Sequence, residues 1–180
     1  MSTGKDFVVY LSKKFYPGPA YYEKGIRTAC IQIERPSPNA KIRRSDYIER
    51  IETFKQANEI FEALLMNAEG YLTEGSKSNL FFVRRGEPGT VYTAPREMVL
   101  EGIMRQYVLD LCAQENISVK FEPIRYSALE EVEALFITGT SINVLPIAKV
   151  DEIQYNSPEN STVLRIMHAF QNYIDTITKG

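Results

Sequence analysis

Residues 62–83 read EALLMNAEGYLTEGSKSNLFFV, and this series of short apolar segments separated by turns most constrains the fold. Residues 63–66 and 80–83 have the composition of buried strands, and between them another strand stops at Glu74. The small-residue loop 76–79 then leads directly into the next strand. Because strands joined so closely leave no room for helical crossovers, we predict a mixed α/β or α+β domain rather than a doubly wound parallel sheet.

Strands and helices alternate along the rest of the chain. Near Ser45 a helix is predicted to bury Tyr47, Ile48, Ile51 and Phe54. A second helix starts near Gly102, with Ile103, Tyr107, Val108, Leu111 and Cys112 as its buried stripe, and the last one starts at Ser157, with Pro158 at its first position. Further strands are predicted at residues 25–34, 91–93, 117–121, 134–138, 144–150 and 153–155, with a short helix at 127–131. Residues 7–11 are either an edge strand followed by a loop or part of an interdomain connection.

The composition fits one soluble domain. The 180 residues are 44% hydrophobic and 24% charged, with a formal charge of −2, which gives no reason to expect nucleic acid or a membrane surface. Cys30 and Cys112 sit in apolar patterns and are predicted to be buried thiols, and His168 is the single histidine, so we expect no metal site. The N-terminus lacks a signal-peptide pattern, and we expect a cytoplasmic protein.

A strand that ends in a carboxylate and a Gly/Ser loop is a common place for a ligand. The free N–H groups of such a loop and the carboxylate converge at the end of the strand. Glu74 and the loop that follows are therefore a candidate site, although these residues alone do not identify the ligand.

Four segments in order, PNAKIRRSDY, TEGSKSNLFFV, LEGIMRQYVLDL and FITGTSINVLPI, resemble the class IV (fold type IV) pyridoxal-phosphate enzymes. This family includes branched-chain and D-amino-acid aminotransferases and aminodeoxychorismate lyase. The resemblance implies that residues 25–180 form the family's large cofactor-binding domain, a partly barrel-like mixed sheet with helices around it. It also implies that residues 1–24 are an interdomain connection or a remnant of the smaller N-terminal domain.

Lys41 is the catalytic candidate that the resemblance selects. An amine is needed to bind the carbonyl of pyridoxal phosphate covalently, and the family's lysine follows an extended loop and precedes a helix, as Lys41 does. Without the resemblance, a lysine beside Arg43 and Arg44 reads as a solvated surface charge. Lys55 and Lys77 fit less well, on a polar helix face and in the small-residue loop.

Glu74 matches the family's carboxylate that pairs with the pyridine nitrogen of the cofactor. An opposite charge there raises the pKa of that nitrogen and makes the ring a better electron sink. Without the family context, Glu74 reads as a surface residue of a turn.

Two segments are candidates for the phosphate, because a helix start and a turn after a strand both offer backbone N–H groups. The family commonly has threonine at the position of Met104, so this chain keeps the backbone donor and lacks the hydroxyl. Without the resemblance, the two segments are interpreted simply as a helix start and a turn. The residues concerned are Gly102, Ile103 and Met104 in the first segment and Gly139, Thr140 and Ser141 in the second.

Other candidates follow from their positions relative to these motifs, although spacing varies within the family. Arg35 and Tyr47 correspond to an arginine before the lysine and a tyrosine after it, near the phosphate and the phenolic oxygen of the cofactor, although Tyr47 fits a core position equally well. Ser76, Ser78 and Asn79 are expected to line the loop, the serines through backbone contacts.

The resemblance implies a transaminase that moves an amino group between an amino acid, with branched-chain substrates as the best guess, and a 2-oxo acid. Lys41 would act as general base and acid. The family also implies a homodimer. An aminodeoxychorismate lyase and a truncated, non-catalytic domain remain alternatives, and we expect this chain alone to be poorly active because the small domain has no counterpart here.

Overall fold

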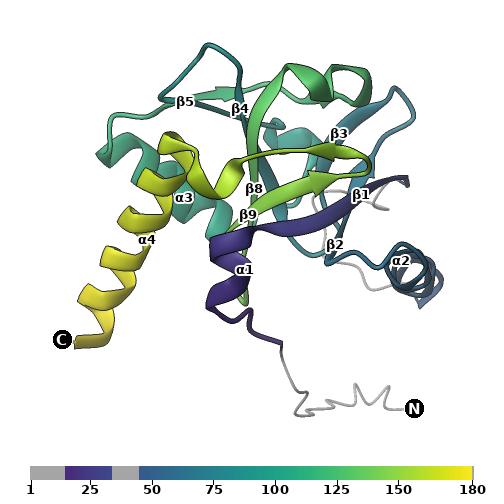
Figure 1. The fold of residues 1–180 in the computed structure, drawn as a ribbon, viewed down its shortest axis with the longest axis horizontal. Helices are drawn as coiled ribbons and strands as arrows, with labels where there is room; N and C mark the ends of the chain where they lie inside the picture. Colours follow the sequence, from purple (N-terminus) through teal and green to yellow (C-terminus); the bar gives the residue numbers. More distant parts are fainter. Residues whose placement is uncertain (1–14, 34–44, 180) are drawn as a thin grey trace, which may run out of the picture.

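The computed structural model describes residues 15–33 and 45–179 (Figure 1). The strands are β1 (Ile26–Gln32), β2 (Glu62–Met66), β3 (Tyr71–Gly75), β4 (Asn79–Arg84), β5 (Thr90–Thr93), β6 (Ser118–Phe121), β7 (Ile124–Arg125), β8 (Val132–Gly139), β9 (Asn143–Val150) and β10 (Ile153–Gln154). The α-helices are α1 (Pro19–Lys24), α2 (Ser45–Ala57), α3 (Ile103–Gln114) and α4 (Ser161–Lys179), with short 3-10 helices at Arg96–Met98, Tyr126–Glu131 and Ser157–Glu159.

Six strands close into a mixed barrel. The order β4-β8-β9-β1-β2-β3 is closed by the pairing of β3 with β4, where Glu74 lies opposite Asn79. β1 is parallel to both β2 and β9, while the other neighbours within the barrel are antiparallel. The predicted mixed α+β domain with a partly barrel-like sheet is confirmed.

Alternation along β4 divides the core into two sides. Leu80 and Phe82 belong to the cluster inside the barrel, whereas Phe81 and Val83 pack against the cluster under α3 and α4. Successive side chains of a strand point to opposite faces, so one fully apolar strand fills both clusters. Figure 1 shows α3 and α4 together on one side of the sheet, with α2 on the opposite flank beside β2.

The buried faces of two helices differ from the predicted stripes. Ile103 and Tyr107 in α3 are 69% and 37% exposed, and Ile48 in α2 is 37% exposed, so their predicted burial was wrong. The stripe of α3 is rotated because Val108, Leu111 and Cys112 are buried together with Arg105, a residue that hydrophobicity alone would place outside. Both cysteines are free thiols; Cys112 is buried as predicted, whereas Cys30 is only partly buried. Burial raises the pKa of the Cys112 thiol to about 12.

The termini of the described chain also differ from the prediction. The α4 helix begins at Ser161 rather than at Ser157, because Asn160 caps it: its side-chain oxygen accepts hydrogen bonds from the N–H groups of Thr162 and Val163. The hydroxyl of Ser157 instead accepts the N–H of Leu135. The short helix α1 was not predicted, and the strand expected at residues 7–11 lies outside the described residues.

Candidate functional site

The end of β3 and the start of β4 bring Glu74 and Asn79 together. They are cross-strand partners joined by the tight loop of residues 75–78, and both are buried, with 2% and 6% of their surface exposed. The amide nitrogen of Asn79 lies 3.4 Å from a carboxylate oxygen of Glu74. The predicted site carboxylate is thus in the protein interior, at the end of a strand.

The segment before α3 completes this polar cluster. The N–H of Leu100 donates to the same oxygen of Glu74 at 3.2 Å, and the amide of Asn79 donates to the Leu100 carbonyl at 2.8 Å. Gly102, the N-cap of α3, lies so close to Asn79 that a Cβ atom at residue 102 would overlap the Asn79 amide oxygen. The backbone therefore brings the first turn of α3, with its free N–H groups, directly to the Glu74 cluster.

Thr138 adds a hydroxyl that the sequence did not single out. It pairs with Asn79 across β4 and β8, so the two side chains lie on the same face of the sheet. Thr138 is 1% exposed, and its Oγ1 has no hydrogen-bond partner among the described residues. Gly139 follows directly and opens the turn to β9, which places the second predicted phosphate segment beside the same cluster.

Glu62 fixes the loop between β3 and β4. Its carboxylate accepts hydrogen bonds from the hydroxyls of Ser76 (2.5 Å) and Ser78 (3.2 Å), and from the N–H groups of Lys77 (3.3 Å) and Ala63 (3.0 Å). Glu62 is only 4% exposed, and these donors offset the cost of burying its charge. The two serines therefore contact Glu62 through their hydroxyls, in addition to any backbone role expected from the sequence.

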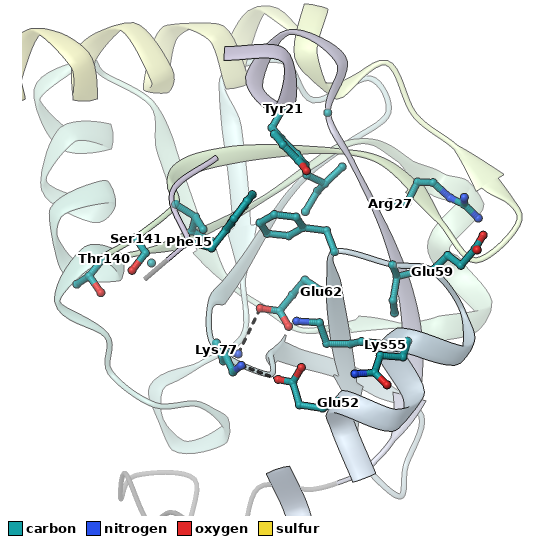
Figure 2. A pocket seen from close by; sticks show the side chains of 17 residues that line it. Phe15, Tyr21, Arg27, Glu52, Lys55, Glu59, Glu62, Lys77, Thr140 and Ser141 are labelled. Carbon is teal, nitrogen blue, oxygen red and sulfur yellow. Dashed lines mark hydrogen bonds and ion pairs between the residues drawn. The ribbon is translucent and has the colours of Figure 1, made fainter. Parts of the chain in front are cut away.

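A pocket of about 950 Å³ lies beside the loop (Figure 2). Its wall includes the turn at residues 139–142 and Lys77, whose carbonyl is in contact range of Gly139. The rings of Phe15, Tyr21 and Phe61 line another part, with centroids 5.5–5.9 Å apart. The turn expected to bind phosphate thus borders both the buried cluster and an open pocket.

Charged side chains surround the lower and right-hand parts of this pocket in Figure 2. We call these residues the charged rim: Arg27, Glu52, Lys55, Glu59 and Lys77. The ammonium of Lys77 lies 2.6 Å from a carboxylate oxygen of Glu52. The hydrogen bond from Lys77 and the charge of Lys55 hold the pKa of Glu52 below its usual value, although partial desolvation opposes them.

Arg105 is a buried cation near the start of α3. One of its terminal nitrogens donates to the carbonyl of Ala94 at 2.9 Å, and the guanidinium carbon lies 5.6 Å from the centre of the Phe121 ring. Desolvation lowers the pKa of Arg105, while the negative charges of Glu101, Glu74 and Glu97 act in the opposite direction. The Glu74 cluster therefore lies within the field of a buried positive charge.

The structure does not place the side chains of the remaining predicted site residues in the Glu74 cluster. Ile103 is exposed and Met104 packs against the core under α3 and α4, so at these positions only the backbone is available to the cluster. Tyr47 packs against the small core formed by Ile51 and its neighbours under α2. Lys41 and Arg35 lie outside the described residues.

Sequence reasoning missed Glu62, Thr138 and Arg105 as parts of the site. Glu62 could have been found from the sequence, because it begins the apolar segment EALLM, which is predicted to be buried. A carboxylate in such a segment needs hydrogen-bond partners nearby. Thr138 precedes a predicted turn, but nothing in the sequence shows that its hydroxyl is buried. Among the described residues, no group of three or more His, Cys, Asp or Glu side chains is arranged to hold a metal.

Known proteins resemble this chain in sequence and in fold. The family model for amino-transferase class IV matches residues 1–150. A probable branched-chain-amino-acid aminotransferase of Aquifex aeolicus is 33% identical over 110 residues, covering 61% of this chain and 35% of that protein. A putative branched-chain-amino-acid aminotransferase of Methanocaldococcus jannaschii is 31% identical over 139 residues, covering 74% of this chain and 47% of that protein.

Two solved structures show the same fold. The branched-chain aminotransferase of the archaeon Thermoproteus uzoniensis, solved with norvaline, matches with a TM-score of 0.76 and 26% identity, over 87% of this chain and 54% of that one. An aminotransferase from Brucella abortus, solved with bound pyridoxal phosphate, matches with a TM-score of 0.72 and 26% identity, over 83% of this chain and 54% of that one. The closed mixed barrel with its flanking helices is thus the fold of type IV aminotransferases.

The chain belongs to the class IV aminotransferase family. It spans about half the length of these two solved structures, and less than half of the two curated relatives. Within the described residues, no helix has the length and apolar character needed to cross a bilayer.

Proposed function

We propose that this chain is the cofactor-binding part of a pyridoxal-phosphate-dependent transaminase, with residues 25–180 as the large domain. The supporting observation is the buried cluster in which Glu74 accepts the Leu100 N–H and contacts Asn79, next to the start of α3. The solved aminotransferase of Brucella abortus, with its bound pyridoxal phosphate, agrees with this cofactor. The curated relatives are named branched-chain-amino-acid aminotransferases, so branched-chain amino acids are the first substrates to test.

The donors present fit a ring with a cationic nitrogen and an anionic phosphate. Glu74 supplies a buried carboxylate for the nitrogen. The N–H groups at residues 102–104 and 139–141 can donate to phosphate oxygens, and the partnerless hydroxyl of Thr138 lies beside the second of these segments in the part of the chain that the structure describes. Bound pyridoxal phosphate supplies the electron sink that stabilises negative charge at the substrate's α-carbon.

The protein's own part in the reaction falls to a few residues. Glu74 would hold a proton on the ring nitrogen, because a neighbouring negative charge favours the protonated form. Glu62, through Ser76 and Ser78, would keep Glu74 and Asn79 in place. We propose that Lys41 binds the cofactor and moves the substrate's α-proton, with Arg35 and Tyr47 as neighbours of the phosphate and the phenolic oxygen.

The test of this proposal is to locate the lysine that reacts with the cofactor. Pyridoxal phosphate is added to the purified chain, the visible absorption is recorded, and borohydride reduction followed by peptide mapping identifies the labelled lysine. We expect a visible band and a label on Lys41 that is absent from Lys41→Ala, with Lys55 and Lys77 as internal controls. A label spread over surface lysines would contradict the proposal.

Turnover by this chain alone is expected to be low. Longer relatives supply about half of their residues from segments that this chain does not match. We therefore propose that a second domain or chain completes the substrate pocket. Amino-group transfer from leucine to a 2-oxo acid at the rate of a full-length relative would contradict this part, and release of pyruvate without an amino acceptor would favour a lyase instead.

A further inference from the structure

Three charged side chains are buried among the described residues: Glu62, Glu74 and Arg105. Burying a charge is costly unless hydrogen bonds or an opposite charge compensate for it. Glu62 is compensated by the four donors that surround it at the loop of residues 75–78. This leaves Glu74 and Arg105 as two opposite charges that are both buried near the start of α3.

Arg105 has few polar contacts of its own. One terminal nitrogen donates to the carbonyl of Ala94 at 2.9 Å, but its Nε has no hydrogen-bond partner among the described residues. The ring of Phe121, whose centre is 5.6 Å from the guanidinium carbon, adds a weak cation–π contact. A buried cation with an unused donor contributes little to the stability of a fold, so packing alone does not explain an arginine at this position.

The backbone connects Arg105 to Glu74 through a short series of close contacts. Glu74 accepts the N–H of Leu100, and Gly102 lies against Asn79, the cross-strand partner of Glu74. Arg105 follows Gly102 in the first turn of α3 and is only 3% exposed. It forms no direct ion pair with any carboxylate of the described residues, so it acts on Glu74 through its charge rather than through a hydrogen bond.

The other carboxylates near Arg105 are exposed. Desolvation lowers the pKa of Arg105, and the negative charges of Glu101, Glu74 and Glu97 raise it. The side chains of Glu97 and Glu101 are 72% and 59% exposed, and both lie within 4 Å of Arg96. Water and salt therefore screen these two charges, whereas the interaction between the two buried groups is screened much less.

The titratable side chains on the elements packed against α3 and β3 contact other residues. Beside β3, Glu62 has its own donors, and Arg84 and Arg125 contact Glu122 and the carbonyl of Glu69. Those on β6, β8 and α4 pair at the surface with residues other than Arg105, and they are Lys120, Glu133, Arg165, Tyr173 and Asp175. Arg105 is therefore the buried cation of the described chain that can act on Glu74.

We propose that Arg105 is a positioning residue that acts through Glu74 and limits how strongly the bound ring nitrogen holds its proton. This proposal rests on the proposed function, in which Glu74 faces that nitrogen. The two buried charges act in opposite directions, because the carboxylate favours the protonated ring, whereas the guanidinium opposes it and keeps the carboxylate ionised. Their balance sets the pH at which the bound ring changes its protonation state.

The experiment records the absorbance of bound pyridoxal phosphate against pH in wild type and in variants of Arg105. Arg105→Met and Arg105→Gln both remove the charge, and the Gln amide is still a donor for the Ala94 carbonyl. In both we expect the absorbance change to move to higher pH by about one unit, because removing a positive charge raises the pKa of nearby groups. Arg105→Lys keeps a charge and should stay within about 0.3 unit of wild type.

Controls separate this effect of charge from a change in structure. Arg165→Met removes an exposed cation that pairs with Glu115 at the other end of α3, and it should leave the titration unchanged. The expected direction is opposite to that for neutralising Glu74, which general loosening of the site would not produce. No shift in the folded Met and Gln variants, or an equal shift in Arg105→Lys, would overturn the proposal.

A second measurement does not need the cofactor. In cofactor-free chain with carbon-13-labelled glutamate carboxyl groups, NMR follows the titration of Glu74, whose signal is the one missing from Glu74→Gln. We expect this signal to titrate at higher pH in Arg105→Met than in wild type. An unchanged signal would show that the charge of Arg105 does not reach Glu74.

The failure of this inference is distinguishable from the failure of the proposed function. If borohydride places the label on Lys41 but neither titration moves in the Arg105 variants, the cofactor assignment stands and Arg105 is not a positioning residue. If the Glu74 signal moves but no label appears on Lys41, the proposed function fails, and with it the role of Arg105 toward the ring, while its action on Glu74 stands.

Discussion

The two sides of the loop at residues 75–78 contrast in how they hold charge. On the inner side, Glu62 and Glu74 are at most 4% exposed and are held by short side chains and backbone N–H groups. On the outer side, the Lys77–Glu52 pair is formed by long side chains with large exposed fractions. The inner side can fix the positions of its groups, whereas the outer side can exchange partners, so the same loop has a rigid face and an adaptable face.

The largest expected effect comes from removing the inner carboxylate that fixes the loop. Glu62→Ala leaves the hydroxyls of Ser76 and Ser78 and two buried N–H groups without their acceptor. We expect the free energy of unfolding to fall by about 3 kcal/mol, within the range for breaking a buried charged network, together with loss of the cofactor's visible band. Urea denaturation measures the change.

Glu69→Ala is the matched control, because Glu69 is an exposed carboxylate on the turn between β2 and β3. It should change the free energy of unfolding by less than about 0.5 kcal/mol. If the two variants lose similar stability, the loop does not depend on Glu62.

The next effect tests the close approach of α3 to the inner side. A Cβ at residue 102 would overlap the amide oxygen of Asn79, so Gly102→Ala must push the helix start or the amide aside. We expect a loss of about 2 kcal/mol, in the range for overpacking a buried contact, measured by urea denaturation. Gly18→Ala is the control, since a Cβ there meets nothing within 4 Å; equal stability of both variants would show that the contact at Gly102 relaxes freely.

Glu74→Gln keeps the size of the side chain but removes the charge proposed to face the ring nitrogen. A nearby carboxylate favours the protonated form of the ring nitrogen, so its removal should lower the pKa of that nitrogen by about one unit or more. The pH-dependent change in the absorbance of the bound cofactor should move to lower pH by the same amount. Spectrophotometric titration of both proteins measures the shift. An unchanged titration in a folded Gln variant would exclude Glu74 as the partner of the ring.

The sequence predicted the strands of this region better than its buried polar contacts. Short apolar segments and turn residues placed β2, β3 and β4 close to their observed bounds, because strand periodicity depends on local composition. The role of Glu62 depends on donors 14 to 16 residues away, and the burial of Arg105 depends on the Ala94 carbonyl and Phe121. Such partners are brought together by the closed barrel, which the pattern along the chain does not specify.

The sequence pattern also did not identify which face of α3 is buried, because that depends on how the helix packs against the sheet. Hydrophobicity put Ile103 and Tyr107 inside, yet the side of α3 that meets the sheet is set by Val108 and Cys112. The stem of Arg105 can pack with these residues while its guanidinium finds a carbonyl, so an arginine occupies a core-facing position. For Lys41 and Arg35 the family resemblance is the available guide, since both lie outside the described residues.

The smallest expected effect is on stability at the outer side. Glu52→Gln should change the free energy of unfolding at pH 7 by less than about 0.5 kcal/mol, because an exposed ion pair is largely screened by solvent. The folded-state pKa of Glu52 lies below its ordinary value, so its small contribution is present above that ordinary value and is lost as the pH falls through the lower, folded-state pKa. Melting temperatures of wild type and Glu52→Gln should therefore converge as the solution is acidified below about pH 4, the ordinary range for glutamate. A loss comparable to that of Glu62→Ala would instead mean that the outer pair, like Glu62, holds the loop in place.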